Sequence, residues 1–233
     1  MNTKIFCDIA DKKVISKFNK IRIVKGFTTN PSLMRKAGAI DYEKYCKEII
    51  KITNKPVSFE VFADDEKNML LQAYKINDWG KNVYVKVPVT NSKGKFMGKV
   101  IKDLNSKKIK INVTAVYTVQ QTKKILNLIK SNSNVIISIF AGRKADAGHD
   151  PLPQVTKSLQ ISKKYKNVEI LWASTREPYN FIQAKQIGCH IITTPPSIIE
   201  KIQNFGKKFN QLTVDTVKGF KIDSQKSKFK LIT

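Results

Sequence analysis

The chain of 233 residues is 41% apolar and 26% charged, which is typical of a globular protein and excludes a wholly disordered one. No apolar run approaches the roughly 18 residues of a membrane-spanning helix. Three scattered cysteines form no C-x-x-C pair, which excludes a disulfide scaffold and a cysteine-built zinc site and is typical of a reducing compartment. We therefore expect a cytoplasmic protein without a signal peptide or a membrane partner.

The net charge of +25 suggests a polyanionic partner such as nucleic acid. Only four of the 43 basic residues are arginine, however, and arginine is the side chain suited to two-pronged recognition of phosphates and bases. The lysines are spread through most of the chain, and an A/T-rich codon bias that also favours Ile and Asn would produce them. We expect dispersed surface charge and no specific nucleic acid partner. A basic nucleic-acid-binding module remains the non-enzyme alternative.

Eight short apolar runs alternate with longer amphipathic segments from one end of the chain to the other. The runs are rich in β-branched and aromatic residues, which predicts strands buried on both faces. They occupy residues 5–8, 23–28, 57–61, 83–87, 111–114, 135–140, 170–174 and 190–193. The segments between them predict helices at 42–53, 65–78, 119–130 with Thr118 as N-cap, 151–165, 178–187 and 197–209. The tail from 213 to 233 begins with helical spacing and becomes rich in Lys and Ser.

Eight buried strands with interposed helices in a chain of this length predict an α/β protein, a single (β/α)8 barrel domain over residues 1–233 with a C-terminal helical tail. A doubly wound sheet is the alternative, but it usually has fewer strands at this length.

Nearly every predicted strand carries a polar residue at its C-terminal end, where barrel enzymes place their catalytic groups. These residues are Asp8, Thr28, Asn30, Glu60, Lys86, Asn112, Thr114, Ser138, Arg143, Ser174 and Arg176. A single Ser or Thr in a strand is usually a satisfied core hydroxyl. Burial of an ionised Asp, Glu or Lys is costly unless the charge is paired, so together the residues indicate a site.

Lys86 is the most informative of these residues, because it lies between Val85 and Val87 in an apolar strand that Pro88 ends. Burial disfavours the ammonium form of a lysine and so favours a neutral amine that can attack a carbonyl. A structural lysine paired with Glu60 or Asp8 is the alternative interpretation.

The chain resembles the transaldolase family along nearly its whole length. The resemblance rests on F-C-D at 6–8, G-F-T-T-N-P-S-L at 26–33, V-S-F-E-V at 57–61, V-K-V-P-V-T at 85–90, N-V-T at 112–114, F-A-G-R at 140–143 and W-A-S-T-R at 172–176. The length resembles the short subfamily, which also contains fructose-6-phosphate aldolases. The resemblance implies a (β/α)8 barrel with a Schiff-base lysine on its fourth strand. It also implies a homo-oligomer, a pentamer or decamer in which the C-terminal helix reaches a neighbour.

The resemblance further implies a role for each site residue. Lys86 would form the Schiff base, Asp8 would exchange the proton of the C4 hydroxyl, and Glu60 with Thr114 would hold the water used in carbinolamine chemistry. The substrate-binding residues would be Thr28, Asn30, Asn112, Ser138 and Phe140 along the sugar, and Arg143, Ser174 and Arg176 at its phosphate. No cofactor is implied, because the lysine is the electron sink, and the isolated His149 and His190 predict no metal site.

Three positions bear on whether the enzyme transfers its three-carbon unit to an acceptor or releases it as free dihydroxyacetone. Family members that cleave fructose 6-phosphate typically have Gln, Ala and Tyr where this chain has Glu60, Ser138 and Phe140, so the resemblance favours a transferase. Such an enzyme would pass a dihydroxyacetone unit from sedoheptulose 7-phosphate or fructose 6-phosphate to an aldose phosphate, with aldolase-type cleavage as the alternative. Thr175 departs from the family pattern, which commonly has Phe there.

Overall fold

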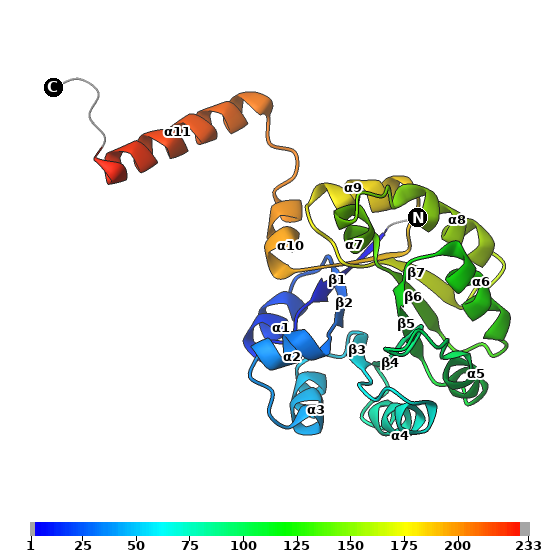
Figure 1. Ribbon diagram of the computed structural model, residues 1–233. Coiled ribbons are helices and arrows are strands. Elements are labelled where there is room, and N and C mark those ends of the chain that lie inside the picture. Colours follow the sequence, from blue (N-terminus) through cyan, green and yellow to red (C-terminus); the bar gives the residue numbers. More distant parts are fainter. Residues whose placement is uncertain (1–2, 229–233) are drawn as a thin grey trace. The chain divides into compact units, whose positions relative to one another are not determined.

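Eight parallel strands close into a barrel in their chain order, and helices surround it (Figure 1). The computed structural model describes residues 3–228. The strands are β1 (Lys4–Asp8), β2 (Val24–Thr28), β3 (Val57–Glu60), β4 (Val83–Pro88), β5 (Ile111–Val116), β6 (Val135–Ile139), β7 (Val168–Trp172) and β8 (Ile191–Thr194). This arrangement confirms the predicted (β/α)8 barrel.

The helices include four that the sequence patterns did not reveal: α1 (Lys12–Asn19), α2 (Pro31–Lys36), α5 (Gly98–Ser106) and α7 (Ala141–Asp146). The others are α3 (Tyr42–Ile52), α4 (Glu66–Asn77), α6 (Val119–Leu128), α8 (Leu152–Ser162), α9 (Tyr179–Gln186), α10 (Pro196–Gln203) and α11 (Phe209–Ser227). The prediction of one helix over 197–209 was wrong, because α10 ends at Gln203 and a separate helix begins at Phe209. Residues 229–233 of the predicted tail lie outside the described residues.

Side-chain caps fix where several helices begin after the strand ends. Thr118 accepts a hydrogen bond from the backbone N–H of Gln121, whose side chain bonds back to Thr118, as the predicted N-cap requires. Asp11, Asp41 and Asp65 cap α1, α3 and α4 in the same manner. These caps set the length of the loops that follow the strands.

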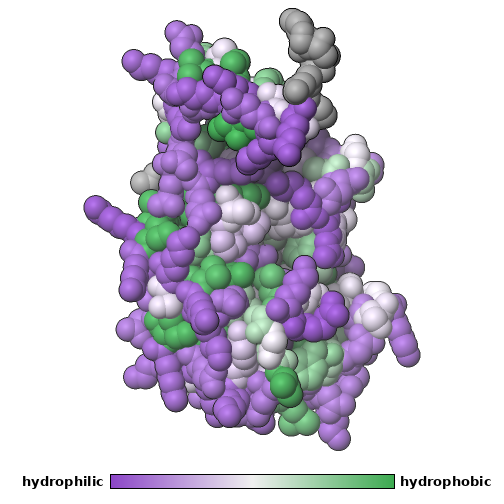
Figure 2. All heavy atoms as spheres, turned by 90° about the vertical axis from the view of Figure 1, so that its left-hand side faces the viewer, coloured by the Kyte–Doolittle hydropathy of each residue, from purple (hydrophilic) through white to green (hydrophobic). Residues whose placement is uncertain are grey.

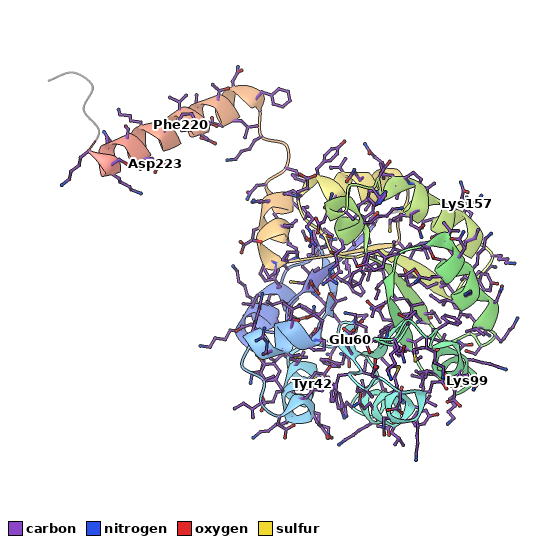
Figure 3. The ribbon with its side chains drawn as sticks, in the orientation of Figure 1. Tyr42, Glu60, Lys99, Lys157, Phe220 and Asp223 are labelled. Atoms are coloured by element: carbon purple, nitrogen blue, oxygen red, sulfur yellow. The ribbon has the colours of Figure 1, made fainter. Side chains whose placement is uncertain are left out.

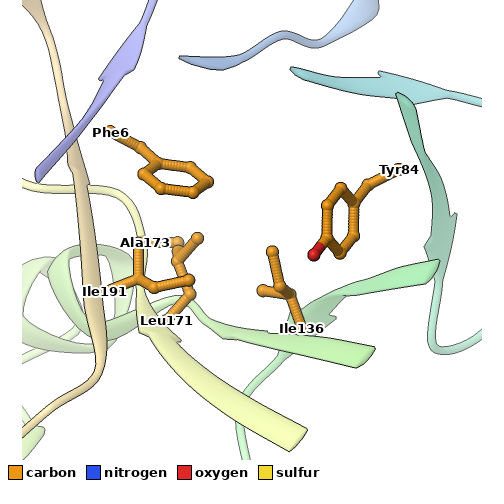
Figure 4. Packing of buried hydrophobic residues seen from close by; sticks show 6 residues of the cluster. All are labelled: Phe6, Tyr84, Ile136, Leu171, Ala173 and Ile191. Carbon is orange, nitrogen blue, oxygen red and sulfur yellow. The ribbon is translucent and has the colours of Figure 1, made fainter. Parts of the chain in front are cut away.

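Apolar side chains from β1, β4, β6, β7 and β8 fill part of the barrel interior. Figure 4 shows the cluster, which contains Phe6, Tyr84, Ile136, Leu171, Ala173 and Ile191. The Phe6 ring occupies the space beside Gly26, where an added Cβ would lie 2.6 Å from the ring. Glycine is therefore required at that position for steric reasons. Because apolar side chains fill this part of the interior, the polar residues gather at the C-terminal ends of the strands.

The strand register brings the polar side chains into neighbouring positions. Asp8 pairs with Thr28, Glu60 pairs with Lys86, and Lys86 also pairs with Asn112 on its other side. Residues that are paired across parallel strands point to the same face of the sheet. The register therefore aligns Glu60, Lys86 and Asn112 along the barrel interior.

The chain divides into two compact units, residues 1–199 and 200–233. The second unit contains α11, which has no buried residue. Its exposed apolar residues are Phe209, Leu212, Val214, Val217, Phe220 and Ile222. Figure 3 shows Phe220 projecting from α11. The single-domain prediction over 1–233 stays a prediction.

Among the described residues, every helix is too short or too polar to cross a bilayer.

Candidate active site

A pocket of about 500 Å³ opens at the C-terminal ends of the strands. Every predicted site residue except Asn112 lines it: Asp8, Thr28, Asn30, Glu60, Lys86, Thr114, Ser138, Phe140, Arg143, Ser174 and Arg176. These residues come from seven different strands or the loops directly after them. The polar strand ends that are scattered along the sequence therefore meet in one cavity.

Lys86 is the one charged side chain in the described residues that is buried, with 7% of its surface exposed. Its ammonium lies 3.0 Å from Glu60 Oε2 and donates a hydrogen bond of 2.9 Å to the carbonyl oxygen of Thr29. These partners compensate for the loss of hydration. The Glu60 pairing proposed as the structural alternative is present, and it leaves the amine inside the pocket.

Glu60 is held at its backbone by Tyr42, which the sequence analysis did not single out. The Tyr42 hydroxyl donates to the Glu60 carbonyl oxygen at 2.9 Å and accepts from the Glu60 N–H at 3.1 Å. Burial raises the pKa of Tyr42, which keeps this hydroxyl protonated. Figure 3 shows Glu60 toward the centre of the barrel and Tyr42 nearer its outer side.

Asp8 is the second carboxylate of the pocket, and its Oδ1 accepts a hydrogen bond of 2.7 Å from the Thr28 hydroxyl. Burial raises the pKa of Asp8 above its ordinary value, while the charge of Lys86 and the Thr28 hydrogen bond act in the opposite direction. A carboxyl group with a perturbed pKa in a pocket is a candidate acid–base residue.

Asn112 is completely buried and lies outside the pocket lining. Its Nδ2 donates to Ser58 at 3.0 Å, and its Oδ1 accepts from the Ser138 hydroxyl at 2.7 Å. Ser138 therefore lines the pocket with its hydrogen already donated to Asn112. By contrast, the buried Thr114 hydroxyl lines the pocket without a partner among the described residues.

The arginines form the positive side of the pocket. Arg176 holds Asp146 with Nε at 2.9 Å and 3.0 Å from the two carboxylate oxygens, and with Nη2 on one of them. This pairing lowers the pKa of Asp146. The Arg143 guanidinium lies over the Phe140 ring, 5.2 Å from its centroid. Both arginines are therefore oriented by neighbours, Arg176 by the last residue of α7 and Arg143 by the residue that precedes α7.

Close backbone contact explains the glycine of the F-A-G-R segment. A Cβ at Gly142 would lie 1.6 Å from the Ser174 carbonyl oxygen, a separation that no side chain tolerates. Ser174 itself has φ of +64°, in the left-handed region that non-glycine residues rarely adopt. Ala115, also in the pocket lining, has φ of +59°. Left-handed residues of this kind gather at functional sites.

The pocket also contains residues that the sequence analysis missed or assigned only in part. Lys36 of α2 and Thr193 of β8 line it. Asn30 uses its Oδ1 to cap α2, where it accepts from Leu33 N–H at 2.9 Å. Its Nδ2 and the second lone pair of Oδ1 therefore remain for a ligand. The sequence carries a signal for this cap, because Asn is a preferred N-cap residue and the proline that follows it is favoured at the first position of a helix.

No cluster of His, Cys, Asp and Glu suited to a metal ion occurs in the part of the chain that the structure describes. His149 is exposed, and His190 accepts a hydrogen bond from the backbone of Ile170.

Fold and site together define a class: (β/α)8-barrel proteins with a buried lysine, two carboxylates and a pair of arginines in one polar pocket. The family model described as "Transaldolase/Fructose-6-phosphate aldolase" matches residues 5–231. The chain belongs to this transaldolase/fructose-6-phosphate aldolase family of enzymes.

Curated relatives extend the likeness across most of the chain. A "probable transaldolase" of Nitrosopumilus maritimus (strain SCM1) is 36% identical over 201 residues, which cover 85% of this chain and 86% of the relative. Another from Thermoanaerobacter sp. (strain X514) is 32% identical over 229 residues, 98% of this chain and 100% of the relative.

Solved structures at low identity share the fold. Inosine 5'-monophosphate dehydrogenase from Legionella pneumophila has a TM-score of 0.58 at 14% identity, covering 82% of this chain and 57% of that one. Orotidine 5'-monophosphate decarboxylase from Metallosphaera sedula has 0.56 at 10% identity, covering 87% and 95%. At these identities the likeness concerns the barrel alone.

We expect Asp8→Asn to stabilise the protein at neutral pH. A raised pKa in the folded state means that folding disfavours the ionised carboxylate, so the contribution of Asp8 is most favourable below its ordinary pKa of 3.8 and is lost as pH rises. Chemical denaturation at several pH values should show the variant more stable near pH 7, with the difference vanishing toward about pH 3.5. A variant less stable than the parent near neutral pH would contradict the burial argument.

Proposed function

We propose that this protein is a transaldolase that transfers a dihydroxyacetone unit from a ketose phosphate, sedoheptulose 7-phosphate or fructose 6-phosphate, to an aldose phosphate through a Schiff base on Lys86. The observation that carries the proposal is the buried amine of Lys86, 3.0 Å from Glu60, inside a pocket with a second carboxylate and two arginines.

The first steps concern the amine and its proton. Glu60 lies where it can accept a proton from the Lys86 ammonium, which frees the amine to attack the C2 carbonyl of the ketose. The resulting carbinolamine loses water and becomes a positively charged iminium. The unpartnered hydroxyl of Thr114 supports its role with Glu60 in holding that water, because a buried hydroxyl needs a hydrogen-bond partner.

The carbon–carbon bond breaks next. Asp8 accepts the proton of the C4 hydroxyl as the electrons of the C3–C4 bond move into the iminium, which leaves an enamine on Lys86 and releases an aldose phosphate. A new aldose phosphate then reacts with the enamine, and Asp8 returns the proton to its carbonyl oxygen. The raised pKa of Asp8 supports this exchange, because the protonated and ionised forms are closer in energy than in an ordinary carboxyl group.

Hydrogen-bonding groups along the pocket fit the rest of the sugar. Thr28, Asn30 and Ser138 line the pocket near the strand ends and would bind the dihydroxyacetone part, with Asn112 orienting Ser138. Phe140 would pack against it, and Arg143, Ser174 and Arg176 would bind the phosphate.

Glu60, Ser138 and Phe140 favour transfer over cleavage of fructose 6-phosphate to free dihydroxyacetone. A Tyr in place of Phe140 would add a hydroxyl to a pocket wall that is apolar at this point. Such a hydroxyl is a candidate proton donor to the enamine, so its absence leaves the three-carbon unit attached for an acceptor.

Dispersed surface charge argues against the nucleic-acid-binding alternative. Lys99 on α5 and Lys157 on α8 lie on the outer side of the barrel, away from each other (Figure 3). Figure 2 shows hydrophilic side chains spread over the face in view rather than gathered in one stripe. Nucleic acid binding needs a continuous basic surface with interleaved aromatic residues. The three free cysteines, all buried, further support the cytoplasm as its location.

We further propose that the chain forms a homo-oligomer. The exposed apolar residues of α11 support this, because a helix with no buried residue gains stability when a second copy covers its apolar side chains. Sedimentation equilibrium of the full chain would refute this by showing a monomer.

The covalent step predicts a specific label. Donor ketose phosphate with borohydride should inactivate the protein and add one three-carbon unit per chain, which peptide mapping should place on Lys86. Lys86→Met should abolish labelling and turnover. Lys99→Met, a matched change at an exposed position of α5, should keep both. An adduct on another lysine would overturn the mechanism.

Transfer predicts dependence on an acceptor. With fructose 6-phosphate alone the protein should release dihydroxyacetone slowly, and erythrose 4-phosphate should accelerate consumption of the donor. Phe140→Tyr should raise cleavage relative to transfer. Rapid release of dihydroxyacetone that ignores the acceptor would favour the aldolase alternative.

The arginines predict selectivity for phosphorylated substrates. Arg176→Ala or Arg143→Ala should weaken binding of a sugar phosphate by roughly 1.5–3 kcal/mol for each charge-assisted hydrogen bond lost, seen as a higher KM. Unphosphorylated dihydroxyacetone as donor should be affected far less. Arg22→Ala, outside the pocket, is the control. Equal losses with both donors would show that these arginines are structural.

A further inference from the structure

A chain of hydrogen bonds crosses three strands and ends on Asp8. The Thr28 hydroxyl donates to Asp8 Oδ1 at 2.7 Å, and Thr28 Oγ1 lies 2.5 Å from Thr193 Oγ1. A hydroxyl group has one hydrogen, and Thr28 gives its own to Asp8. Thr193 is therefore the donor to Thr28, and the direction of the chain runs from β8 through β2 to β1.

Thr193 is itself held in place. It is 6% exposed and lines the pocket, and it lies opposite Phe6 in the pairing of β8 with β1. Its carbonyl oxygen accepts a hydrogen bond of 2.7 Å from the hydroxyl of Thr175, which is also 6% exposed. The segment after β7 thus fixes the end of β8, and with it the position of the Thr193 hydroxyl.

The next residue on β8 provides a contrast. Thr194 is completely buried, and its hydroxyl has no partner among the described residues. Successive residues of a strand point to opposite faces, so Thr193 faces the pocket and Thr194 faces away from it. Two threonines with the same chemistry therefore occupy one strand, and only one of them is linked to the carboxylate, through Thr28.

We infer that Thr193 is a positioning residue for Asp8: by donating to Thr28 it keeps the Thr28 hydrogen on Oδ1, holds the carboxylate in its proton-accepting form and leaves Oδ2 for the substrate hydroxyl. Among the described residues no donor reaches Oδ2. Hydrogen bonds in a chain polarise and strengthen one another, and donors to an ionised carboxylate favour that form. The inference rests on the proposed function, in which Asp8 exchanges the C4 proton.

The other charged or titratable groups around Asp8 stay in place when Thr193 loses its hydroxyl. Burial disfavours the ionised carboxylate, and Lys86 on β4 favours it. The remaining charged or titratable groups near Asp8 are Cys7 beside it on β1 and, in the pocket lining, Lys36, Glu60, Arg143 and Arg176. Substitution of Thr193 leaves all of them in place, so a shifted titration of Asp8 would report the hydroxyl chain.

The test compares three variants of the full chain: Thr193→Val, which removes the hydroxyl at nearly constant shape, Thr193→Ser, which keeps it, and Thr194→Val as the matched control. The readout is the pH profile of kcat/KM for transfer from fructose 6-phosphate to erythrose 4-phosphate. In Thr193→Val the acid limb should move up by about half a pH unit to one unit, which lowers kcat/KM on that limb roughly threefold to tenfold.

The conservative variant and the control should behave differently from Thr193→Val. Thr193→Ser should restore the position of the acid limb, and Thr194→Val should leave it unchanged. An acid limb that stays in place in Thr193→Val, or that moves equally in Thr194→Val, would overturn the inference.

A direct titration separates this inference from the proposed function. Carboxyl carbon NMR of Asp8, without substrate, should show a higher pKa in Thr193→Val than in the parent and in Thr193→Ser. If the pKa of Asp8 is higher in Thr193→Val but the parent shows no transfer activity, the proposed function is refuted. The role of Thr193 in the hydrogen-bond chain is then still supported. Transfer activity with an unchanged Asp8 titration in Thr193→Val would refute the role of Thr193 alone.

Discussion

The burial of one ammonium group constrains much of the pocket. Lys86 is 7% exposed, and a lysine charge removed from water is stable only with compensating partners. Glu60 and the Thr29 carbonyl oxygen provide them, at 3.0 Å and 2.9 Å. Glu60 is itself held in place: Tyr42 fixes its backbone with two hydrogen bonds, and the register of β3 against β4 sets it directly beside Lys86. A reactive amine is thus maintained by contacts that extend to α3.

The sequence allows the barrel and most of the pocket to be predicted, because both follow from local patterns. An isolated Lys86 between two valines is visible in the chain, and so is a polar residue at the end of nearly every apolar run. Tyr42 and Thr193 were not predictable in this manner. Thr193 contacts a residue 165 positions away, and nothing local distinguishes it from Thr194, which has no such contact. The helices α2 and α7 were missed because six residues display too few turns for a clear apolar period.

The two arginines of the pocket differ from the lysines that give the protein its charge. Thirty-nine lysines could attract phosphate, yet in the pocket two of the four arginines are oriented before any ligand arrives, Arg176 by Asp146 and Arg143 by the Phe140 ring. The carboxylate of Asp146 offsets one of the two positive charges, so binding relies on the direction of the N–H groups more than on the total charge. A guanidinium held in this manner loses less conformational freedom on binding than a solvated lysine.

Thr175 links the two ends of the pocket. It replaces the Phe that is common in the family, and its hydroxyl bonds to the carbonyl oxygen of Thr193, a contact that Phe has no group to make. It also lies between Ser174, whose backbone is left-handed, and Arg176. A displacement of this loop by a bound phosphate would therefore act on the backbone of Thr193, and through its hydroxyl and Thr28 on Asp8. Under the proposed function, Thr175 thus connects the loop that would bind the phosphate with the carboxylate that would exchange the proton.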